Sequence, residues 1–465
     1  MLKISKQLFN HWNSGNVRYC HWKSNEHLME GLDGKTDLDV YVFLEDKPAA
    51  EKSLLELDFI KFKQQPYCTY PNVDEWIGFD YDTGALIHVH LHYKIITGTK
   101  YNKEYVFPLD NLIIDTRIKN EETEVYTTSY ELELLILYSR ITLKANDKKH
   151  IIPDNDYLKE IAYLKKRFDR DSLKSLLDDV LKEDASKVYL YIVKESLSPE
   201  DWHELYLIIL RWLKPYRSKS KIHVFSRYYY FVIRNVIISI FNNRFEGLFF
   251  TKKAMPNRGI SICFIGVDGS GKSTVSKDIS KWLSWKIENH SFYLGSGDGY
   301  KRNQSVILRL VNKFGHPAHN LVNISKYYVL QLKKAEKYIQ RGGIAIYDRF
   351  PQIQFRGLYD GPKIAIYHAD DMDKSNVARM ARMEENNIDF CQAYQPNLLF
   401  KLVIPVEESI RRKHDDEVMI RKKYDITEKL CFEHSETHII DGTQDYAQEI
   451  LIIKRIIWKG LLTKQ

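Results

Sequence analysis

The chain has 465 residues, of which 44% are hydrophobic and 28% charged, an ordinary globular composition with length for about two to four domains. The five cysteines are far apart and form no Cys-x-x-Cys, so neither a disulfide framework nor a zinc site is indicated. The net charge of +7 suits phosphorylated partners, and no nucleic-acid motif occurs, so we expect no specific nucleic acid as partner. Neither a signal peptide nor an uncharged apolar span of about 18 residues is visible, which predicts a cytoplasmic protein.

Residues 1–125 alternate short β-like runs with turns, which predicts a small α+β domain. One strand is expected over 40–44, and a hairpin is expected over 76–81 and 85–93. Asp37 and Asp39 lie at positions i and i+2 of a strand that continues into 40–44, and the two-residue period of a strand puts both carboxylates on one face. Paired carboxylates hold divalent ions for nucleotidyl transfer, so both residues are candidate metal ligands and catalytic groups.

Three histidines alternate along the second arm of the hairpin, at His88, His90 and His92. Histidines on one face of a strand can bind a transition metal. They are equally typical of a hairpin surface or of hydrogen-bonded side chains, and the sequence leaves both interpretations open.

Residues 126–215 lose the β pattern, and apolar spacing predicts helices over 130–144, 157–168, 172–182 and 202–213. The next segment, 216–258, is basic and aromatic. Its most apolar part, 228–250, is interrupted by polar and charged residues and surrounded by lysines and arginines. Two interpretations follow: 214–258 contacts the anionic inner face of a membrane, or it forms an interdomain helix packed on its neighbours.

From residue 259 onward strand and helix signals alternate, which predicts a parallel sheet with covering helices. An apolar run at 260–265 leads into Gly-Val-Asp-Gly-Ser-Gly-Lys-Ser at 266–273, and a helical pattern follows. Strand, glycine loop and helix is the context of a phosphate-binding loop, in which the lysine reaches the phosphates and the serine ligates Mg²⁺. The candidate nucleotide-binding residues are Gly266, Asp268, Gly269, Ser270, Gly271, Lys272, Ser273 and Thr274.

A second apolar strand, 343–347, ends at Asp348 and Arg349. A carboxylate at a strand end beside a phosphate loop can hold Mg²⁺ or take a proton, and the adjacent arginine can clamp an acceptor phosphate. After a third strand at 398–404, Arg411, Arg412 and Arg421 are candidates to close over the transferring phosphates. A surface ion pair and a solvated charged helix face are the alternative interpretations.

Four motifs resemble the thymidylate kinase family of nucleoside monophosphate kinases. They are the loop at 264–274, Asp-Arg-Phe at 348–350, Pro-Asn-Leu-Leu at 396–399 and Asp-Gly-Thr at 441–443, with 411–423 in the lid position. The resemblance implies ATP as donor, Mg²⁺ as cofactor, Asp268 facing the acceptor sugar and Arg349 at the acceptor phosphate.

The acceptor half departs from the thymidylate kinase pattern. Pro-Gln-Ile-Gln-Phe-Arg at 351–356 replaces the family's acceptor-contacting residues, and Gly-Ser-Gly-Asp-Gly at 295–299 stands where an arginine-rich acceptor loop is usual. We therefore expect a small acceptor other than dTMP.

The N-terminal region is similar to the nucleotidyltransferase superfamily. His-Trp-Lys-Ser at 21–24 ends thirteen residues before Asp37, as the superfamily's Gly-Ser turn precedes its Asp-x-Asp strand. The closer resemblance is to members encoded in surface-polysaccharide gene clusters, some of which are fused to a thymidylate kinase-like region. It implies that Ser24 lies at a nucleotide phosphate. Lys23 replaces the usual glycine, and His90 replaces the third carboxylate, for which Asp80 or Asp82 could substitute.

Together these features predict an α/β chain with a nucleotidyltransferase-like region (1–125), a helical region (126–215), a basic aromatic helix or linker (216–258) and a thymidylate kinase-like region (259–465). The leading hypothesis is an ATP- and Mg²⁺-dependent phosphotransferase for a small phosphorylated or sugar-containing acceptor, with a second, nucleotidyl-transferring role in surface polysaccharide biosynthesis. The alternative is a regulatory or defence protein that senses or hydrolyses nucleotide and carries a degenerate nucleotidyltransferase domain.

Overall fold

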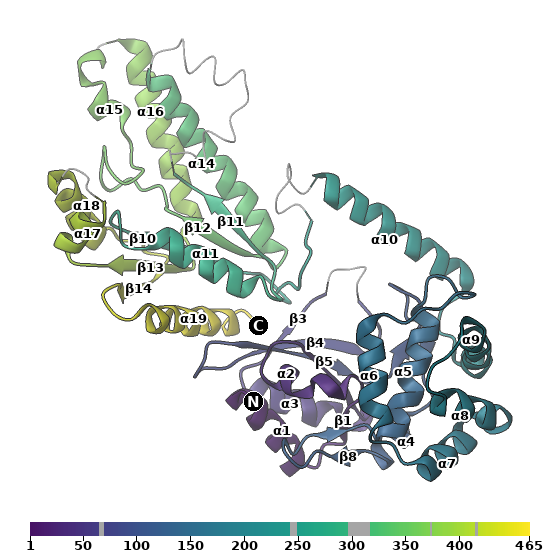
Figure 1. Cartoon of the computed structure of the whole chain (residues 1–465). Helices are drawn as coiled ribbons and strands as arrows, with labels where there is room; N and C mark the ends of the chain where they lie inside the picture. Colours follow the sequence, from purple (N-terminus) through teal and green to yellow (C-terminus); the bar gives the residue numbers. More distant parts are fainter. Residues whose placement is uncertain (65–68, 242–248, 296–316, 373, 414–416) are drawn as a thin grey trace. The chain divides into compact units, whose positions relative to one another are not determined.

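The computed structural model describes residues 1–64, 69–241, 249–295, 317–372, 374–413 and 417–465 (Figure 1). The chain divides into two compact units, Met1–Arg244 and Phe245–Gln465, called unit 1 and unit 2 below. The β-rich and helical segments expected for 1–215 both lie in unit 1. Of the glycine-rich segment 295–299, only Gly295 belongs to the described residues.

Unit 1 contains a mixed seven-stranded sheet in the order β3-β4-β5-β2-β1-β9-β8. β2 runs parallel to β5 and antiparallel to β1, while β4 and β5 form the predicted antiparallel hairpin. The strands are β1 (Tyr19–His21), β2 (Asp37–Val42), β3 (Ile60–Phe62), β4 (Val73–Phe79), β5 (Leu86–His92), β8 (Ile118–Lys119) and β9 (Tyr126–Thr127). A separate two-stranded ladder pairs β6 (Ile96–Thr97) with β7 (Tyr105–Val106).

The two faces of this sheet have different cores. On one face Leu38 and Val40 of β2 pack with helices α1 (Lys3–Ser14), α2 (Leu28–Leu32) and α3 (Lys47–Glu56) (Figure 1). Because alternate residues of a strand point to opposite sides, Asp37, Asp39 and Tyr41 lie on the other face. There Tyr41 joins the apolar core of the helical part of the unit.

The helical part of unit 1 shares one core and contains two helices that were not expected, α4 (Asp110–Asp115) and α8 (Ala185–Val193). Its other members are α5 (Tyr130–Lys144), α6 (Asn155–Lys165), α7 (Arg170–Leu181) and α9 (Pro199–Leu213). Serine or aspartate side chains cap the first turns of α5, α6, α7 and α9, which satisfies N–H groups that have no partner within the helix. α8 was not predicted, because its nine residues are too few for a clear period.

The last helix of unit 1, α10 (Lys221–Phe241), packs by one side. Phe231 is 3% exposed and stacks on Tyr101, with ring centroids 4.7 Å apart. The opposite side carries apolar residues at three- and four-residue spacing, each 48 to 82% exposed. These residues, called the α10 stripe below, are Ile222, Phe225, Tyr229, Ile233, Val236 and Ile240. Among the helices in the described part of the chain, α10 included, there is none with the length and hydrophobicity needed to cross a bilayer.

Unit 2 contains a five-stranded sheet with every pairing parallel, in the order β11-β12-β10-β13-β14. Its strands are β10 (Ser261–Gly266), β11 (Asn289–Tyr293), β12 (Ile344–Asp348), β13 (Leu398–Val403) and β14 (Glu436–Asp441). The first strand is central, and later strands lie on both sides of it. In such sheets ligands bind beyond the carboxyl ends of the strands, where the strand order reverses.

Helices cover both faces of this sheet. α11 (Lys272–Leu283) and α19 (Tyr446–Leu462) lie on one side, and α14 (Pro317–Gln340) and α16 (Ser375–Cys391) lie on the other (Figure 1). The short α15 (Ile364–Tyr367) contacts α16. Two basic helices, α17 (Val406–Lys413) and α18 (Glu417–Lys429), follow β13, and α18 contacts β10. The fold therefore brings α18 to the central strand whose end carries the glycine loop.

Candidate functional site

The loop between β10 and α11 has the backbone of a phosphate cradle. Gly269 and Gly271 have φ angles of 85° and 90°, a left-handed conformation that glycine adopts without strain. At Gly266 a Cβ atom would lie 2.6 Å from the carbonyl oxygen of Leu402, so this position admits no side chain. α11 begins at Lys272, and the unpaired N–H groups of its first turn therefore adjoin the loop. Ser273 and Thr274 are exposed on that turn.

Lys272 is largely buried within this loop. Its Nζ donates a hydrogen bond to the carbonyl oxygen of Val267 at 2.7 Å and lies 4.0 Å from Asp268 Oδ1. Burial lowers the pKa of Lys272 to about 8. Burial also opposes the ionisation of Asp268, but Lys423, Lys272 and Arg349 hold its pKa below the ordinary value. Phosphate oxygens at the loop would supply the negative charge that a buried lysine needs.

A cavity of about 270 Å³ adjoins the loop. Its charged and aromatic lining includes Asp268, Lys272, Arg349, Tyr359, Asp360, Lys363, Tyr367 and Lys423. Four of these side chains are cations and two are carboxylates. The cavity therefore suits an anionic ligand that also carries hydroxyl or other polar groups.

Arg349 lies between two carboxylates of this cavity. Its guanidinium nitrogens are 3.9 Å from Asp268 Oδ1 and 3.7 Å from Asp360 Oδ2. Burial opposes its charge, but Asp360 and Asp268 hold the pKa of Arg349 above its ordinary value. Arg349, Tyr359 and Asp360 all have positive φ, at 70°, 49° and 57°. Strained backbone of this kind gathers at binding sites, and no motif in the sequence had indicated Tyr359 or Asp360.

Asp348 ends β12 next to the loop, opposite Phe264 of β10 in the sheet register. Its negative charge acts on Lys272, where it opposes the lowering of the lysine pKa by burial. Asp348 and Ser273 are the residues of unit 2 that would hold Mg²⁺, because both offer oxygen beside the phosphate cradle.

Of the three arginines predicted for the lid, one reaches the glycine loop and two pair with surface glutamates. Arg412 Nη1 donates to the carbonyl oxygen of Gly269 at 3.1 Å, so it reaches the loop. Arg411 pairs with Glu408 on the surface, and Arg421 pairs with Glu417 at 2.8 Å. Lys423 belongs to the basic segment 411–423 but was not among the candidate site residues, and its ammonium contacts the carboxylate of Asp268.

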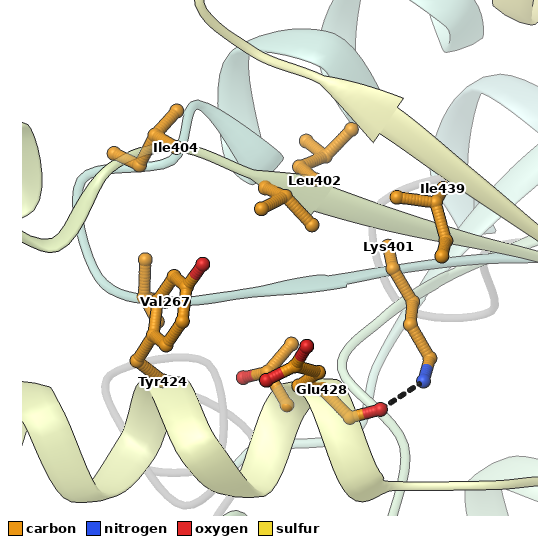
Figure 2. Close-up of a pocket in the computed structure, with 9 residues that line it drawn as sticks. Val267, Lys401, Leu402, Ile404, Tyr424, Glu428 and Ile439 are labelled. Carbon is orange, nitrogen blue, oxygen red and sulfur yellow. Dashed lines mark hydrogen bonds between the residues drawn. The ribbon is translucent and has the colours of Figure 1, made fainter.

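Residues of α18 line both the site cavity and a smaller cavity of about 140 Å³. Figure 2 shows the smaller one. The smaller cavity lies between Tyr424 of α18 and Leu402 of β13, and its lining is mostly apolar (Figure 2). There the ammonium of Lys401 donates a hydrogen bond to the backbone carbonyl oxygen of Glu428 at 3.0 Å (Figure 2). The space shows that α18 packs incompletely on β13.

Unit 1 holds a second polar cluster, in which Asp37 and Asp39 lie beside the histidines of β5. The parallel register puts Asp37 opposite His88 and Asp39 opposite His90. Asp37 Oδ1 accepts a hydrogen bond from His88 Nδ1 at 2.7 Å. Asp39 Oδ1 lies 3.3 Å from both His90 Nδ1 and His92 Nε2.

Glu75 on β4 is a third carboxylate of this cluster, and sequence reasoning missed it. It accepts hydrogen bonds from His88 Nε2 at 2.7 Å and from His90 Nε2 at 2.9 Å. Asp80, a candidate for the third carboxylate, instead accepts N–H groups of Ile4 and of the hairpin turn. The observed register pairs Glu75 with His90, whereas the predicted arms, 76–81 and 85–93, would pair Trp76 with it. A shift of one residue in the turn therefore hid Glu75 from the sequence.

A cation adjoins the cluster. Lys23 Nζ lies 2.9 Å from Asp39 Oδ1, and Ser24 beside it has a left-handed φ of 55°. Burial opposes the ionisation of Asp39, but Lys23 and the two neighbouring histidines hold its pKa well below the ordinary value. Burial also opposes the charge of His90, while Glu75 and Asp39 raise its pKa to about 9; burial lowers the pKa of His92 to about 4.

This donor set does not fit the two Mg²⁺ ions that nucleotidyl transfer uses. Mg²⁺ requires near-octahedral oxygen ligands. Here the groups around Asp39 are an ammonium and two imidazoles, and the partner of Asp37 is a third imidazole.

The strand order of unit 2, with a glycine loop leading from the central strand into α11, is typical of P-loop nucleoside monophosphate kinases. Unit 2 has a P-loop kinase-like fold.

No family model matches the chain. It is 26% identical over 210 residues to the "Uncharacterized ATP-binding protein YghR" of Escherichia coli (strain K12), with 40% of this chain and 82% of that protein covered. It is also 26% identical over 217 residues to "Uncharacterized ATP-binding protein YghS" of the same strain, with 41% and 88% covered.

Two solved structures are similar to the chain at 18% identity each. They are deoxyadenosine kinase from M. mycoides with bound dATP (TM-score 0.28, covering 42% of this chain and 97% of that one) and thymidylate kinase from Candida albicans (TM-score 0.29, covering 45% and 96%).

Proposed function

We propose that unit 2 is an ATP- and Mg²⁺-dependent phosphotransferase that acts on a small acceptor: a nucleotide, a sugar or a sugar phosphate. The observation that carries the proposal is the shared lining of the glycine loop and the adjoining cavity. Asp268 and Lys272 belong to both, so a phosphate on the loop and a ligand in the cavity would lie side by side. The names of the two relatives, which are ATP-binding proteins, agree with ATP as donor.

Each residue of the unit 2 site has its own role in the proposed reaction. The loop N–H groups and Lys272 bind the donor phosphates, and Ser273 with Asp348 would hold Mg²⁺. When bound, the ion neutralises phosphate charge. Arg349 and Lys423, which lie nearest to different oxygens of Asp268, bind the acceptor and the group in transfer. Arg412 adds charge from α17, as would Arg411 and Arg421 after leaving their surface partners.

We expect dTMP to be a poor acceptor. The loop after Arg349 does not offer a free amide to read a base, since Gln352 is fully buried and donates to the carbonyl oxygens of Phe355 and Leu358 at 2.8 Å each. A panel of nucleoside monophosphates, sugars and sugar phosphates assayed with ATP tests the proposal. The kcat/KM for dTMP should fall far below about 10⁵ M⁻¹s⁻¹, a usual enzyme value, and another member should exceed it. A dTMP value near that level would refute the acceptor assignment.

The alternative function is nucleotide sensing or hydrolysis in a regulatory or defence role, with a degenerate unit 1. The pairing of Lys23 and three histidines with the carboxylates of unit 1 favours degeneracy of that site. Steady ATP hydrolysis that no acceptor changes would favour this alternative.

For unit 1 we propose a nucleotidyltransferase-like domain that serves the same pathway, in surface polysaccharide biosynthesis. Its support is the common face of Asp37 and Asp39, with Ser24 in a strained turn beside Lys23. By analogy of fold, unit 2 would phosphorylate a sugar-like acceptor and unit 1 would then nucleotidylate it.

We also propose that segment 214–258 lies on an anionic membrane surface. The sequence of this segment contains ten lysines and arginines against one acidic residue, so it carries +9 in a chain whose net charge is +7. The α10 stripe supplies an apolar side of the kind that in-plane helices insert at the headgroup boundary, while adjacent cations attract anionic lipid.

A vesicle assay tests the membrane proposal. The full chain should sediment with vesicles containing about 30% phosphatidylserine and much less with neutral ones. Ile233→Glu in the stripe should reduce binding by about tenfold or more, because it removes apolar burial and adds a repelled charge. Leu190→Glu, at an equally exposed leucine of α8, is the matched control and should bind like the wild type. Equal binding of both variants contradicts the proposal, and loss of self-association in Ile233→Glu alone would assign the stripe to a second copy of the chain.

A further inference from the structure

The carboxylate–histidine cluster of unit 1 directs two imidazole nitrogens at one carboxylate oxygen, Asp39 Oδ1. His90 Nε2 lies 2.9 Å from Glu75 Oε2, a distance at which the nitrogen donates its proton to the carboxylate. The other ring nitrogen of His90, Nδ1, lies 3.3 Å from Asp39 Oδ1. Both ring nitrogens therefore adjoin carboxylates, and Nδ1 is placed to hold either a proton or a metal ion beside Asp39.

His92 directs a second imidazole at the same oxygen. Its Nε2 also lies 3.3 Å from Asp39 Oδ1, and the ring is 1% exposed. Metal bonds of about 2.0–2.1 Å in a tetrahedral arrangement place ligand atoms about 3.3 Å apart. An ordinary hydrogen bond between such groups is shorter, at about 2.9 Å. The two distances therefore match the edges of a metal site better than a pair of hydrogen bonds.

His88 is excluded as a ligand by the same reasoning. Both of its ring nitrogens are engaged at 2.7 Å, by Asp37 and by Glu75. It links the two carboxylates, and Glu75 in turn orients His90. A carboxylate that holds the second nitrogen of a ligating histidine is the usual support of a metal site.

We infer that Asp39, His90 and His92 hold one transition-metal ion, of the class of Zn²⁺, Mn²⁺ or Fe²⁺, in place of the Mg²⁺ pair expected from the Asp-x-Asp pattern. Two imidazoles and one carboxylate are the donor set that these ions prefer, and they leave coordination positions open for water or a ligand oxygen. His90 is 23% exposed on its side chain, so the site has an approach from solvent. Lys23, which contacts Asp39, lies at the edge of the site, where an ammonium would attract an anionic ligand.

Metal titration of the chelator-treated full chain, without nucleotide, tests this inference. Equilibrium dialysis with Zn²⁺ or Co²⁺ should give one tightly bound ion per chain, whereas Mg²⁺ should not compete at millimolar concentration. His90→Gln combined with His92→Gln should weaken binding at least about 100-fold, because two of three ligands are lost. The matched control is His27→Gln, an exposed histidine of the same unit, which should bind like the wild type.

X-ray absorption on the zinc-loaded wild-type protein provides a readout that depends on no variant. Scattering from two imidazoles in the first coordination sphere is expected. A sphere of oxygens alone, stoichiometric binding that survives in the double variant, or the absence of bound Zn²⁺ and Co²⁺ would overturn the inference. Phosphotransfer by unit 2 should be unchanged in the double variant, so failure here is distinct from failure of the proposed kinase function.

Discussion

Lys272→Ala is expected to lower ATP-dependent phosphotransfer by about 10² to 10³-fold, which corresponds to roughly 3 kcal/mol of lost transition-state stabilisation. The reason is local: the ammonium is held inside the glycine loop, 2.7 Å from a loop carbonyl oxygen, and is the charge nearest the site for donor phosphates. Initial rates with a reactive acceptor at saturating ATP measure the effect. Lys281→Ala, at an exposed lysine of the same helix, is the control and should leave the rate unchanged.

The pH dependence of nucleotide binding gives this prediction a second signature. Burial lowers the pKa of Lys272 to about 8, so the ligand-free protein loses the binding charge as the pH rises through 8. Affinity for a non-hydrolysable ATP analogue should therefore decrease between pH 7 and pH 9 in the wild type, by up to tenfold per unit above 8. Lys272→Ala should bind more weakly without that slope. Full activity in the variant would remove Lys272 from the phosphate site.

Arg349→Ala should lower kcat/KM for the acceptor by about 10²-fold and leave ATP affinity nearly unchanged. The guanidinium lies between Asp268 and Asp360 in the cavity, where it can hold an acceptor phosphate by two charge-assisted hydrogen bonds. Removing the guanidinium also leaves the negative charges of Asp268 and Asp360 less neutralised, so both carboxylates repel an incoming anion more strongly.

Arg356→Ala is the matched control for this experiment. Arg356 lies on the same loop but pairs with Glu385 at 3.0 Å and does not line the cavity. Steady-state kinetics with varied acceptor, together with ATP binding by calorimetry, separate the two substrates. A loss confined to ATP binding, or equal losses in both variants, would place Arg349 outside the acceptor site.

The strands of unit 2 that are buried on both faces can be predicted from the sequence. β10, β12 and β13 are buried on both faces, so each appears in the sequence as an apolar run, interrupted in β13 by Lys401. β11 lies at the edge and contains Asn289, His290 and Ser291, which give no such run. The glycine loop is predictable for a different reason: its conformation depends on local glycines and on the strand and helix beside it.

The rest of the two sites depends on contacts between distant segments. Lys423 reaches Asp268 only because α18 crosses the end of β10, and no local pattern distinguishes it from Arg421. Tyr359 and Asp360 enter the cavity through a loop with no motif of its own. Glu75 depends on hairpin register, which sequence gives only once the turn is fixed. The kinds of residue that a reaction needs can therefore be predicted more easily than which individual lysine, aspartate or glutamate lies in the site.

The central claim is that unit 2 transfers the γ-phosphoryl group of ATP to a small molecule. The most direct measurement is incubation of the full chain with γ-³²P-labelled ATP, Mg²⁺ and a protein-free small-molecule extract, followed by chromatography of the products. A labelled small molecule is expected with the wild type and with Lys281→Ala, and no labelled product is expected with Lys272→Ala. Release of the label only as inorganic phosphate, at a rate that the extract does not change, would contradict it.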